Sequence, residues 1–541
     1  MQNIEKKLEK ESDDGNVEYK LKLVDKTNER IEKLISQMRY RCQEGFGECI
    51  YNLGVADDGT MIGLTNEEYQ ETINTLRIMA KSNNYSITNL TSTEVENNKK
   101  VYEVLFREHN DNKYIEVKVA VAGAVDSGKS TTMGTLISGK NDDGRGSARL
   151  SVFNYNHEVK SGRTSSIAHH IIGFNDEGKI MNYSSNKITW PEIVQRSSKI
   201  ISFFDLAGHE KYLKTTILGL SSSFPDICFI IVGANMGISK MTREHIFICI
   251  TLKIPFVIIL TKIDICDTRQ NVLEETVQQL NKLLKFPGIR RIPITVRTID
   301  DVVICAKNIY SESIVPVFHI SNVTGLGTDR IKEFLNLVGK KQQVSNTSSD
   351  MVEYYIDNTF SVSGVGTVTG GHLVCGTIRV GDKLLLGPNN GSYETVAVRS
   401  IHCKRVPLQI VSHGCYVCLG LKKVDRNHIR KGNVLISLNS NQLITNTFKA
   451  EINILRTHSS TIRVGYQPVL HSSAIRQTVI FKEIINKVNA RNPDETVNDG
   501  ILRTGDKATV LLQFRARPEY LKTGARILLC EGKCKITGTV L

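Results

Sequence analysis

The sequence contains no run of about 18 apolar residues, which excludes a transmembrane helix and predicts no membrane partner. Residues 1–16 are rich in charge and include no apolar stretch, so we expect no signal peptide. Their acidic residues also argue against a transit peptide. The twelve cysteines lack the spacing of a disulfide framework, which indicates reduced thiols and a cytoplasmic protein.

What is present is an ordinary globular composition, with 40% hydrophobic and 23% charged residues. At about 100–200 residues per domain, the chain of 541 residues predicts roughly three to five domains. The formal net charge of +13 attracts polyanions and makes RNA a candidate partner. Charge alone does not decide this, because many basic proteins bind no nucleic acid.

The first part of the chain is expected to be a flexible N-terminus, residues 1–14, followed by an α+β accessory domain, residues 15–113. Short strands interrupted by Asp57-Asp58-Gly59 are expected in this domain. Alternation of apolar and polar residues predicts strands at Glu18–Val24 and Lys99–Phe106. Helical spacing of apolar residues predicts helices at Arg30–Gln43 and Glu67–Ser82.

The next segment, residues 114–340, alternates continuous apolar runs with helical segments. Strands that are apolar throughout are buried on both faces, so this pattern predicts an α/β domain with a mostly parallel sheet. The apolar runs are YIEVKVAVAG, KIISFFDLAG, DICFIIVGA, PFVIILTKID and IVPVFHIS.

A change of rhythm follows the polar segment 341–350, which we expect to be a linker. Beyond it, short alternating segments are punctuated by glycine, which predicts small β-barrels. A break near residues 439–446 divides this part into two barrels, residues 351–440 and 445–541.

The strongest motif, G-x-x-x-x-G-K-[ST], follows one of the apolar runs and precedes a helical segment. The glycines let backbone N–H groups surround phosphate, and the helix N-terminus adds positive potential. Lys129 is expected to reach the β- and γ-phosphates, and Ser130 to bind Mg²⁺. The predicted phosphate-binding residues are Gly123, Ala124, Val125, Asp126, Ser127, Gly128, Lys129, Ser130 and Thr131.

A second apolar run ends in the motif D-x-x-G-H at Asp205, Gly208 and His209. A carboxylate at this place can hold the Mg²⁺ shell, and the glycine N–H can bond to the γ-phosphate. Such a loop is sensitive to hydrolysis of the nucleotide. His209 is placed by its neighbours to position water.

The tetrapeptide T-K-x-D, with Thr261, Lys262 and Asp264, ends a third apolar run. Asp264 can accept two hydrogen bonds from N1–H and the N2 amino group of guanine, whereas adenine offers no such donor pair. Lys262 can lie along the plane of the base. The predicted nucleotide is therefore GTP or GDP, and a P-loop ATPase fits poorly. The backbone N–H groups expected to contact the guanine O6 are those of Ser321, Asn322 and Val323.

In this order, the motifs resemble those of the translational GTPases, the group of elongation factor Tu and elongation factor 1-alpha, which also have His after D-x-x-G. SGVGTVTGG and VGDKLLLGP are similar to the second domain of that group, and GYQPVLHSSAIRQT and LRTGDKATVLLQF to its third. A closer resemblance, over nearly the whole chain, is to the GTP-binding protein 1 and 2 family. It is carried by EYKLKLV, EGFGECIYNLG, SGRTSSI, DLAGHEKYLKTT, TKID, ISNVTG and SIHCKRVP.

The resemblance implies a P-loop GTPase domain followed by two small β-barrels, with the α+β accessory region in front. It implies hydrolysis of GTP to GDP and phosphate with Mg²⁺, as a switch in translation elongation, ribosome-associated surveillance or mRNA turnover. The partners implied are the ribosome, tRNA or mRNA, and exchange or surveillance factors, and we expect a monomer. The alternative is a GTP-dependent module that binds RNA or protein and turns over little GTP.

The resemblance also implies roles for individual residues. Val125 would flank the attacking water, and Asp126 would help to bind a monovalent cation. Asp205 would reach Mg²⁺ through water, and Gly208 would sense the γ-phosphate. His209 would turn inward to orient the water when the ribosome engages.

Two departures from the family pattern concern the switch I segment and the guanine motif. Where elongation factors have R-G-I-T-I, with a Thr that binds Mg²⁺, this chain has R-T-S-S-I at residues 163–167. When Arg163 is aligned with the Arg of R-G-I-T-I, Ser166 falls at the position of the Mg²⁺-binding Thr. Thr164 is the alternative residue for this role. In that alignment Ser165 replaces the apolar residue that gates the histidine. Thr261 replaces the commoner Asn, and its hydroxyl can still tie this loop to the P-loop.

Overall fold

The structure is a computed structural model. It describes residues 8, 10–12, 15–23, 27–45, 47–95, 98–108, 114–153, 156–161, 164, 167–183, 188–266, 270–286, 289–341, 351–389, 391–422, 424–455, 461–488, 500–531 and 533–541. Ser165, Ser166, most of the expected N-terminal tail and nearly all of the expected linker lie outside the described residues.

The N-terminal part forms a four-stranded sheet in the order β1-β2-β4-β3, in which only the β1–β2 pair is parallel. The expected strand Glu18–Val24 is shorter, because Leu23 leaves the sheet and its N–H donates to Thr72. Strand β3 is longer than any other strand here and was not expected from the sequence. The strands are β1 (Val17–Lys20), β2 (Glu48–Leu53), β3 (Tyr85–Glu94) and β4 (Lys100–Glu108).

Two helices, α1 (Asn28–Glu44) and α2 (Asn66–Asn83), pack on this sheet and confirm the expected helices. Helix α2 begins with a capping box, in which Thr65 and Glu68 bond to each other's backbone N–H groups. It ends at Asn84, which adopts the left-handed conformation with φ of 57°.

The central part contains a seven-stranded sheet in the order β10-β11-β9-β8-β5-β7-β6. All its pairs are parallel except β6–β7, so the expectation of a mostly parallel sheet is confirmed. The strands are β5 (Ile115–Gly123), β6 (Ala168–Phe174), β7 (Lys199–Asp205), β8 (Ile227–Gly233), β9 (Phe256–Thr261), β10 (Ile292–Thr295) and β11 (Ile314–His319).

Helices cover both faces of this sheet, because alternate side chains of each strand point to opposite faces. Val119 and Val121 face the core beneath α3, α10 and α11, whereas Ala120 and Ala122 face the core beneath α6, α7 and α9. The helices are α3 (Lys129–Ser138), α4 (Asn156–Ser161), α5 (Trp190–Gln195), α6 (Leu213–Ser222), α7 (Lys240–Leu252), α8 (Ile263–Cys266), α9 (Gln270–Leu284), α10 (Ile299–Asn308) and α11 (Thr328–Leu337).

Two β-barrels follow, as expected from the glycine-punctuated alternation. The first closes where β15 pairs with both β20 and β16. Its strands are β12 (Glu353–Val362), β13 (Gly366–Cys375), β15 (Lys383–Asn389), β16 (Ser392–Cys403), β17 (Val406–Leu408), β19 (Tyr416–Lys422) and β20 (Val434–Ser437), with the side pair β14 (Thr377–Arg379) and β18 (Ile410–Ser412).

The second barrel is closed by six strands in the order β21-β26-β24-β23-β27-β28. These are β21 (Thr447–Ile454), β23 (Val469–Ser472), β24 (Ile475–Val488), β26 (Lys507–Phe514), β27 (Arg526–Glu531) and β28 (Lys533–Val540), beside the pair β22 (Thr461–Arg463) and β25 (Ile501–Arg503). None of the helices in the described part of the chain combines the length and apolar character that a membrane span requires.

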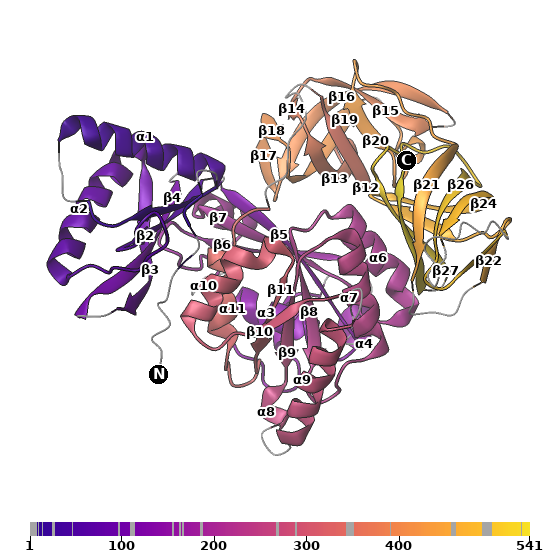
Figure 1. Ribbon diagram of the computed structural model, residues 1–541. Coiled ribbons are helices and arrows are strands. Elements are labelled where there is room, and N and C mark those ends of the chain that lie inside the picture. Colours follow the sequence, from indigo (N-terminus) through magenta and orange to yellow (C-terminus); the bar gives the residue numbers. More distant parts are fainter. Residues whose placement is uncertain are drawn as a thin grey trace.

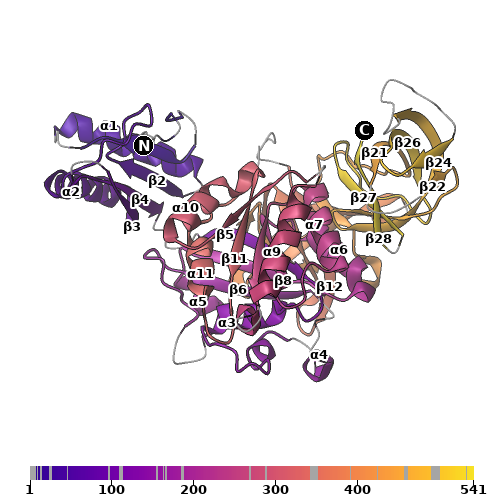
Figure 2. The ribbon, with the colours of Figure 1, turned by 60° about the horizontal axis from the view of Figure 1, so that its bottom comes forward.

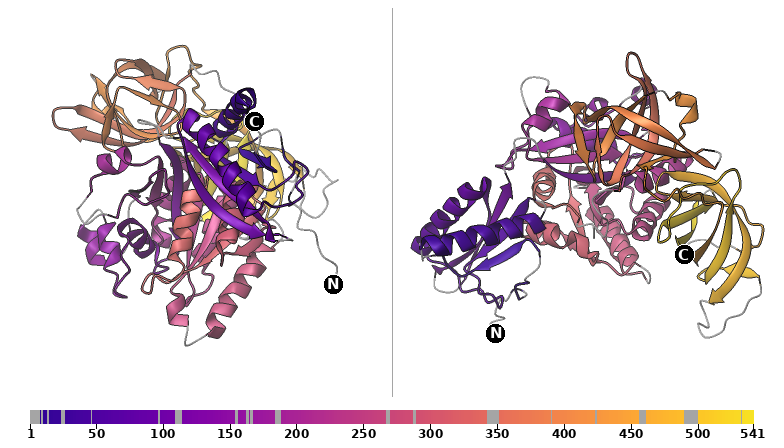
Figure 3. Two further views of the ribbon diagram at one scale, coloured as in Figure 1. Left: turned by 90° about the vertical axis from the view of Figure 1, so that its left-hand side faces the viewer. Right: turned by 90° about the horizontal axis from the view of Figure 1, so that it is seen from above.

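The N-terminal sheet and the two barrels lie on opposite sides of the central α/β part (Figures 1 and 2). The view from above in Figure 3 shows the same arrangement. A buried ion pair of 2.8 Å joins Lys404 of the first barrel to Glu116 of β5. The barrels are joined to each other by ion pairs of 2.6 Å between Arg430 and Glu519 and between Lys522 and Glu353.

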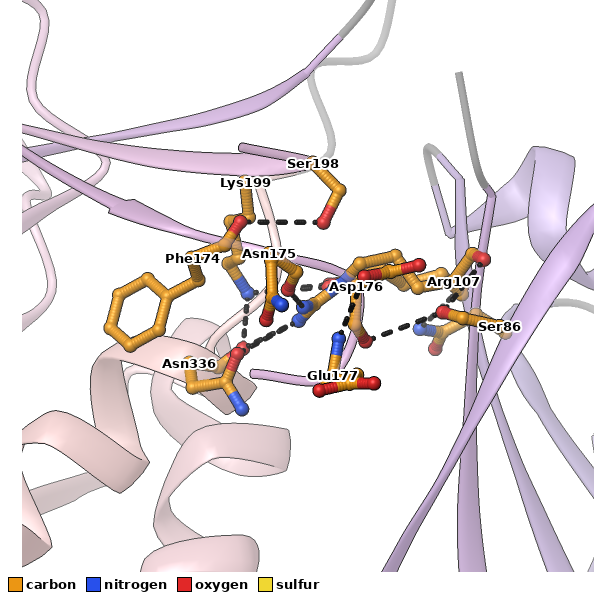
Figure 4. Close-up of polar contacts among 11 residues, drawn as sticks. Ser86, Arg107, Phe174, Asn175, Asp176, Glu177, Ser198, Lys199 and Asn336 are labelled. Atoms are coloured by element: carbon orange, nitrogen blue, oxygen red, sulfur yellow. Dashed lines mark hydrogen bonds and ion pairs between the residues drawn. The ribbon is translucent and has the colours of Figure 1, made fainter. Parts of the chain in front are cut away.

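Buried charge also joins the N-terminal sheet to the central part (Figure 4). The Glu48 carboxylate accepts from Arg107 at 2.7 Å and lies 3.4 Å from Lys199 Nζ of β7. Arg107 also donates to the backbone oxygens of Asn175 and Asn336, and Lys199 donates to that of Asn336. Burial lowers the pKa of Lys199 to about 8, although the Glu48 carboxylate acts in the opposite direction.

We expect Glu48→Ala to lower the free energy of unfolding by about 3–5 kcal/mol, because it leaves Arg107 and Lys199 as uncompensated buried cations. Urea unfolding followed by circular dichroism measures this loss. Glu333→Ala is the control, since its pair with Arg330 on α11 is partly exposed and contributes about 0–1 kcal/mol. A small effect of similar size in both variants would contradict the role given to Glu48.

Candidate functional site

The predicted P-loop connects the end of β5 to the start of α3 and encloses a cavity. Gly123 and Gly128 have φ of 156° and 90°, in the region that favours glycine. A Cβ at Gly123 would lie 2.4 Å from the backbone oxygen of Ile231, so a larger residue does not fit. Lys129 is buried, and its Nζ donates to the backbone oxygen of Ala124 at 2.8 Å.

The cavity brings together residues from four segments of the chain. It contains most of the predicted phosphate-binding residues, together with Thr164, Gly208 and His209. Two cationic residues line it, Lys129 and Arg149. The lining residues are Val125, Asp126, Gly128, Lys129, Ser130, Thr131, Arg149, Thr164, Gly208 and His209.

Three oxygen-bearing side chains converge beside the cavity. Ser130 Oγ lies 2.8 Å from Thr164 Oγ1 and 2.9 Å from Asp205 Oδ2. Thr164 Oγ1 also donates to Asp205 Oδ2 at 3.3 Å. Of the two alternatives for switch I, the structure places Thr164 here, whereas Ser166 lies outside the described residues.

These oxygens fit a Mg²⁺ ion, which prefers hydroxyl, carboxylate and phosphate oxygens in proteins. Asp205 is 1% exposed, and its Oδ1 has no hydrogen-bond partner among the described residues. Burial raises the pKa of this carboxyl to about 6, although Lys129 lowers it. A cation beside Asp205 would therefore stabilise its ionised form.

The D-x-x-G-H loop continues directly from β7. Its start is held by the N–H of Leu206, which donates to Val121, and by Thr216, which donates to the backbone oxygen of Ala207 at 2.6 Å. A Cβ at Gly208 would lie 2.2 Å from Lys129 Nζ, so only glycine fits beside this lysine without displacing it. His209 is partly exposed, and its Nδ1 accepts the N–H of Lys211 at 3.1 Å.

The predicted guanine-binding loops lie next to the P-loop. Thr261 ends β9, and its hydroxyl donates to the backbone oxygen of Ser127 at 2.6 Å, which confirms the expected tie between the two loops. Lys262 has φ of 61°, and Asp264 follows in the first turn of α8. The N–H of Ile263 donates to the oxygen of Ile320, which brings this loop beside Ser321-Asn322-Val323.

Asn322 connects that last loop to the P-loop helix. Its Nδ2 donates to Thr132 of α3 at 2.9 Å, and its Oδ1 has no partner among the described residues. Ser321 Oγ accepts the N–H groups of Val323 and Thr324 at 3.3 and 3.2 Å, which holds the turn. The backbone N–H groups predicted to meet guanine thus lie in a turn fixed by a side chain.

The sequence did not single out Arg149, although it lines the phosphate cavity. It lies in the short 3₁₀-helix η2 (Ala148–Ser151), between α3 and Thr164, one of the two predicted switch I residues. No motif marks an arginine at this distance from the P-loop, so only the three-dimensional arrangement shows its position.

Two family models match the chain. The elongation factor Tu GTP binding domain matches residues 116–355, and elongation factor Tu domain 2 matches residues 366–436. GTP-binding protein 2 of Homo sapiens is 42% identical over 98% of this chain and 88% of its own length. GTP-binding protein 1 of Xenopus laevis is 42% identical over 97% of this chain and 78% of its own. Elongation factor 1-alpha of Pyrococcus horikoshii is 27% identical over 73% of this chain and 89% of its own length.

Solved structures show the same fold at lower identity. The elongation factor SelB of Methanococcus maripaludis, in complex with the GTP analogue GppNHp, has a TM-score of 0.53 and is 18% identical, with 80% of each chain covered. A bacterial selenocysteine-specific elongation factor also has a TM-score of 0.53 at 18% identity, but this chain spans only 58% of its length.

We expect Thr164→Ala to raise the Mg²⁺ concentration required for half-maximal GTP binding by roughly 10-fold, because one of three converging oxygens is lost. Titration of Mg²⁺ against a fluorescent GTP analogue measures the shift. Ser166→Ala, the other switch I hydroxyl, should leave the midpoint unchanged. A shift confined to Ser166→Ala would assign the metal to Ser166 instead.

Proposed function

This chain belongs to the GTP-binding protein 1 and 2 family of translational GTPases, and from that membership we propose that it hydrolyses GTP to GDP and phosphate as a molecular switch at the ribosome. The observation that carries the proposal is the convergence of Ser130, Thr164 and Asp205 beside a cavity that Lys129 and His209 also line. A single site thus combines metal-binding oxygens, a phosphate-binding cation and an imidazole.

In the proposed reaction, the P-loop and Lys129 hold the β- and γ-phosphates. Ser130, Thr164 and Asp205 would hold Mg²⁺, directly or through water, and the ion when bound would neutralise charge on the phosphate oxygens. Gly208 follows the metal-binding strand by three residues, so its N–H can report on the γ-phosphate through the position of the loop.

His209 is the proposed residue for orienting the attacking water, with Val125 beside it in the same cavity. Its Nδ1 accepts a backbone N–H, so the proton of the neutral ring is on Nε2. Nε2 can therefore donate to the attacking water or to a γ-phosphate oxygen. Base selection is assigned to Asp264 and Lys262, with the turn at Ser321-Asn322-Val323 beside them.

We further propose that Asp126, which lines the cavity with φ of 58°, helps to bind a monovalent cation. A dependence of GTP hydrolysis on potassium that persists unchanged in Asp126→Ala would exclude this role.

The proposed setting is a monomeric, RNA-binding, cytoplasmic protein. Its proposed partners are the ribosome, tRNA or mRNA, and exchange or surveillance factors.

The proposed domains are residues 15–113, 114–340, 351–440 and 445–541. In this scheme the GTP-bound state orders switch I and the D-x-x-G-H loop, and hydrolysis releases both. Because Lys404 of the first barrel pairs with Glu116 of β5, a change in the angle between these domains would strain that buried pair. The barrels would thereby respond to the state of the nucleotide.

We expect His209→Ala to lower the ribosome-stimulated rate of GTP hydrolysis by about 10²–10⁴-fold, because a positioned proton donor is lost. GTP affinity should change little, since the P-loop is intact. Single-turnover hydrolysis with and without ribosomes, together with equilibrium binding, measures both quantities. His428→Ala is the control, because His428 is exposed on the first barrel.

Equal losses of rate and affinity in His209→Ala would exclude the proposed catalytic role. Tight GTP binding by the wild type without stimulation by ribosomes would instead favour the alternative, a GTP-dependent module that binds RNA or protein. In that case, a search for ligands that bind only the GTP form would follow.

A further inference from the structure

Arg149 occupies a position in the phosphate cavity that none of the nucleotide-binding motifs includes. It lies 20 residues after Lys129 in the sequence, on η2, yet both residues line the same cavity. Among the described residues, no hydrogen bond or ion pair is made by its guanidinium, whereas the Lys129 ammonium donates to Ala124. Arg149 therefore contributes a planar set of N–H donors that no group among the described residues occupies.

The backbone beneath Arg149 is firmly held against the P-loop helix. A Cβ at Gly134 of α3 would lie 2.0 Å from the backbone oxygen of Ala148, so the two segments touch at a point where only glycine fits. The Asp142 carboxylate accepts the N–H groups of Gly144, Gly146 and Ala148 at 3.0, 3.1 and 2.9 Å. The turn that leads to Arg149 is thus fixed by its own hydrogen bonds.

The same turn is connected to the guanine site. The N–H of Asp142 donates to the backbone oxygen of Asn322 at 2.8 Å, in the loop predicted to meet the base. Hydrogen bonds from Asn322 through Asp142 to Ala148 therefore connect the predicted guanine loop to η2.

The guanidinium itself lies against a glycine. A Cβ at Gly146 would come within 2.5 Å of Arg149 Nε and 2.8 Å of Cζ, and Gly146 has φ of 90°. Any side chain at residue 146 would displace the guanidinium. This glycine leaves space for Arg149 beside the cavity.

We propose that Arg149 is a catalytic arginine supplied by the chain itself, which donates to the γ-phosphate oxygens during GTP hydrolysis. The proposal rests on the proposed function of this site. In the reaction, the water oxygen bonds to the γ-phosphorus while the bond between the γ-phosphorus and the bridging oxygen breaks. The bonding electron pair leaves with GDP, and the water proton ends on the released phosphate. The arginine stays protonated throughout and contributes only charge and hydrogen bonds.

A planar fork of donors suits the three equatorial oxygens of the transferring phosphoryl group, over which charge is spread in the transition state. In the proposed function, Lys129 and the P-loop N–H groups would already bind phosphate in the ground state. An additional cation held by a preformed turn costs little reorganisation when the charge shifts, so its effect falls mainly on the rate.

The test compares Arg149→Ala, Arg149→Lys and wild type in the full chain by single-turnover GTP hydrolysis at saturating protein, with and without ribosomes. We expect Arg149→Ala to lower the rate by about 10²-fold or more, while affinity for a fluorescent GTP analogue changes by less than about 3-fold. Arg149→Lys should recover only part of the rate, because one ammonium cannot reproduce the fork. Arg145→Ala is the matched control, since Arg145 is exposed on the same turn and does not line the cavity.

A second measurement separates catalysis from a structural effect. Fluorescent GDP with tetrafluoroaluminate, a mimic of the transferring phosphoryl group, should form a complex with wild type and Arg145→Ala but not with Arg149→Ala. Circular dichroism and GDP affinity that match the wild type show that the variant is folded.

An unchanged rate in Arg149→Ala, or a loss of affinity as large as the loss of rate, would overturn the proposal. If wild type hydrolyses GTP and Arg149→Ala does so equally well, only the role of Arg149 fails. If wild type shows no hydrolysis with or without ribosomes, the proposed function fails and the catalytic role of Arg149 fails with it.

Discussion

The buried carboxylate of Asp205 is the point on which the arrangement of the site depends. It is almost inaccessible to solvent, and one of its oxygens receives the hydroxyls of Ser130 and Thr164. These residues come from the end of β7, the start of α3 and the switch I segment, which lie far apart in the sequence. A buried negative charge requires compensation, and here the compensating groups are those that a nucleotide and its metal would contact.

Strand β7 extends this dependence beyond the nucleotide site. It begins at Lys199, which lies 3.4 Å from the Glu48 carboxylate of the N-terminal sheet, and it ends at Asp205. Its neighbour β6 pairs with it in antiparallel register, from Ala168 opposite Asp205 to Phe174 opposite Lys199. The two strands that carry the switch segments at one end therefore contact the accessory sheet at the other.

Much of the site could be predicted because its motifs are local. Gly123 and Asp205 end apolar strands, and Lys129 and Asp264 lie in the first turns of the helices that follow β5 and β9. Spacing along the sequence was therefore enough to predict a place for each of them. The tie from Thr261 to the P-loop also followed from local chemistry, since a hydroxyl can replace an amide as donor.

The remaining features depend on tertiary contacts. The place of Thr164 depends on its contact with Ser130 of α3, which no periodicity of the sequence specifies. Arg149 belongs to no motif, and its place follows from the close contact at Gly134. Strand β3 lacks a strong apolar alternation and forms because β4 offers it a partner along its length.

The second barrel meets the central part through an apolar cluster and through two hydrogen bonds, from Ser221 to the backbone oxygen of Ser473 and from Arg526 to that of Thr251. Leu528 and Cys530 of β27 are buried in the same cluster as Ile217 of α6 and Ile246 of α7. The first barrel has the buried ion pair between Lys404 and Glu116, and its Tyr355 and His372 also contact the ring of Phe224 in the α/β part. Apolar association weakens on cooling because the entropy of water drives it. Cooling is therefore expected to weaken the apolar contacts that both barrels make with the α/β part.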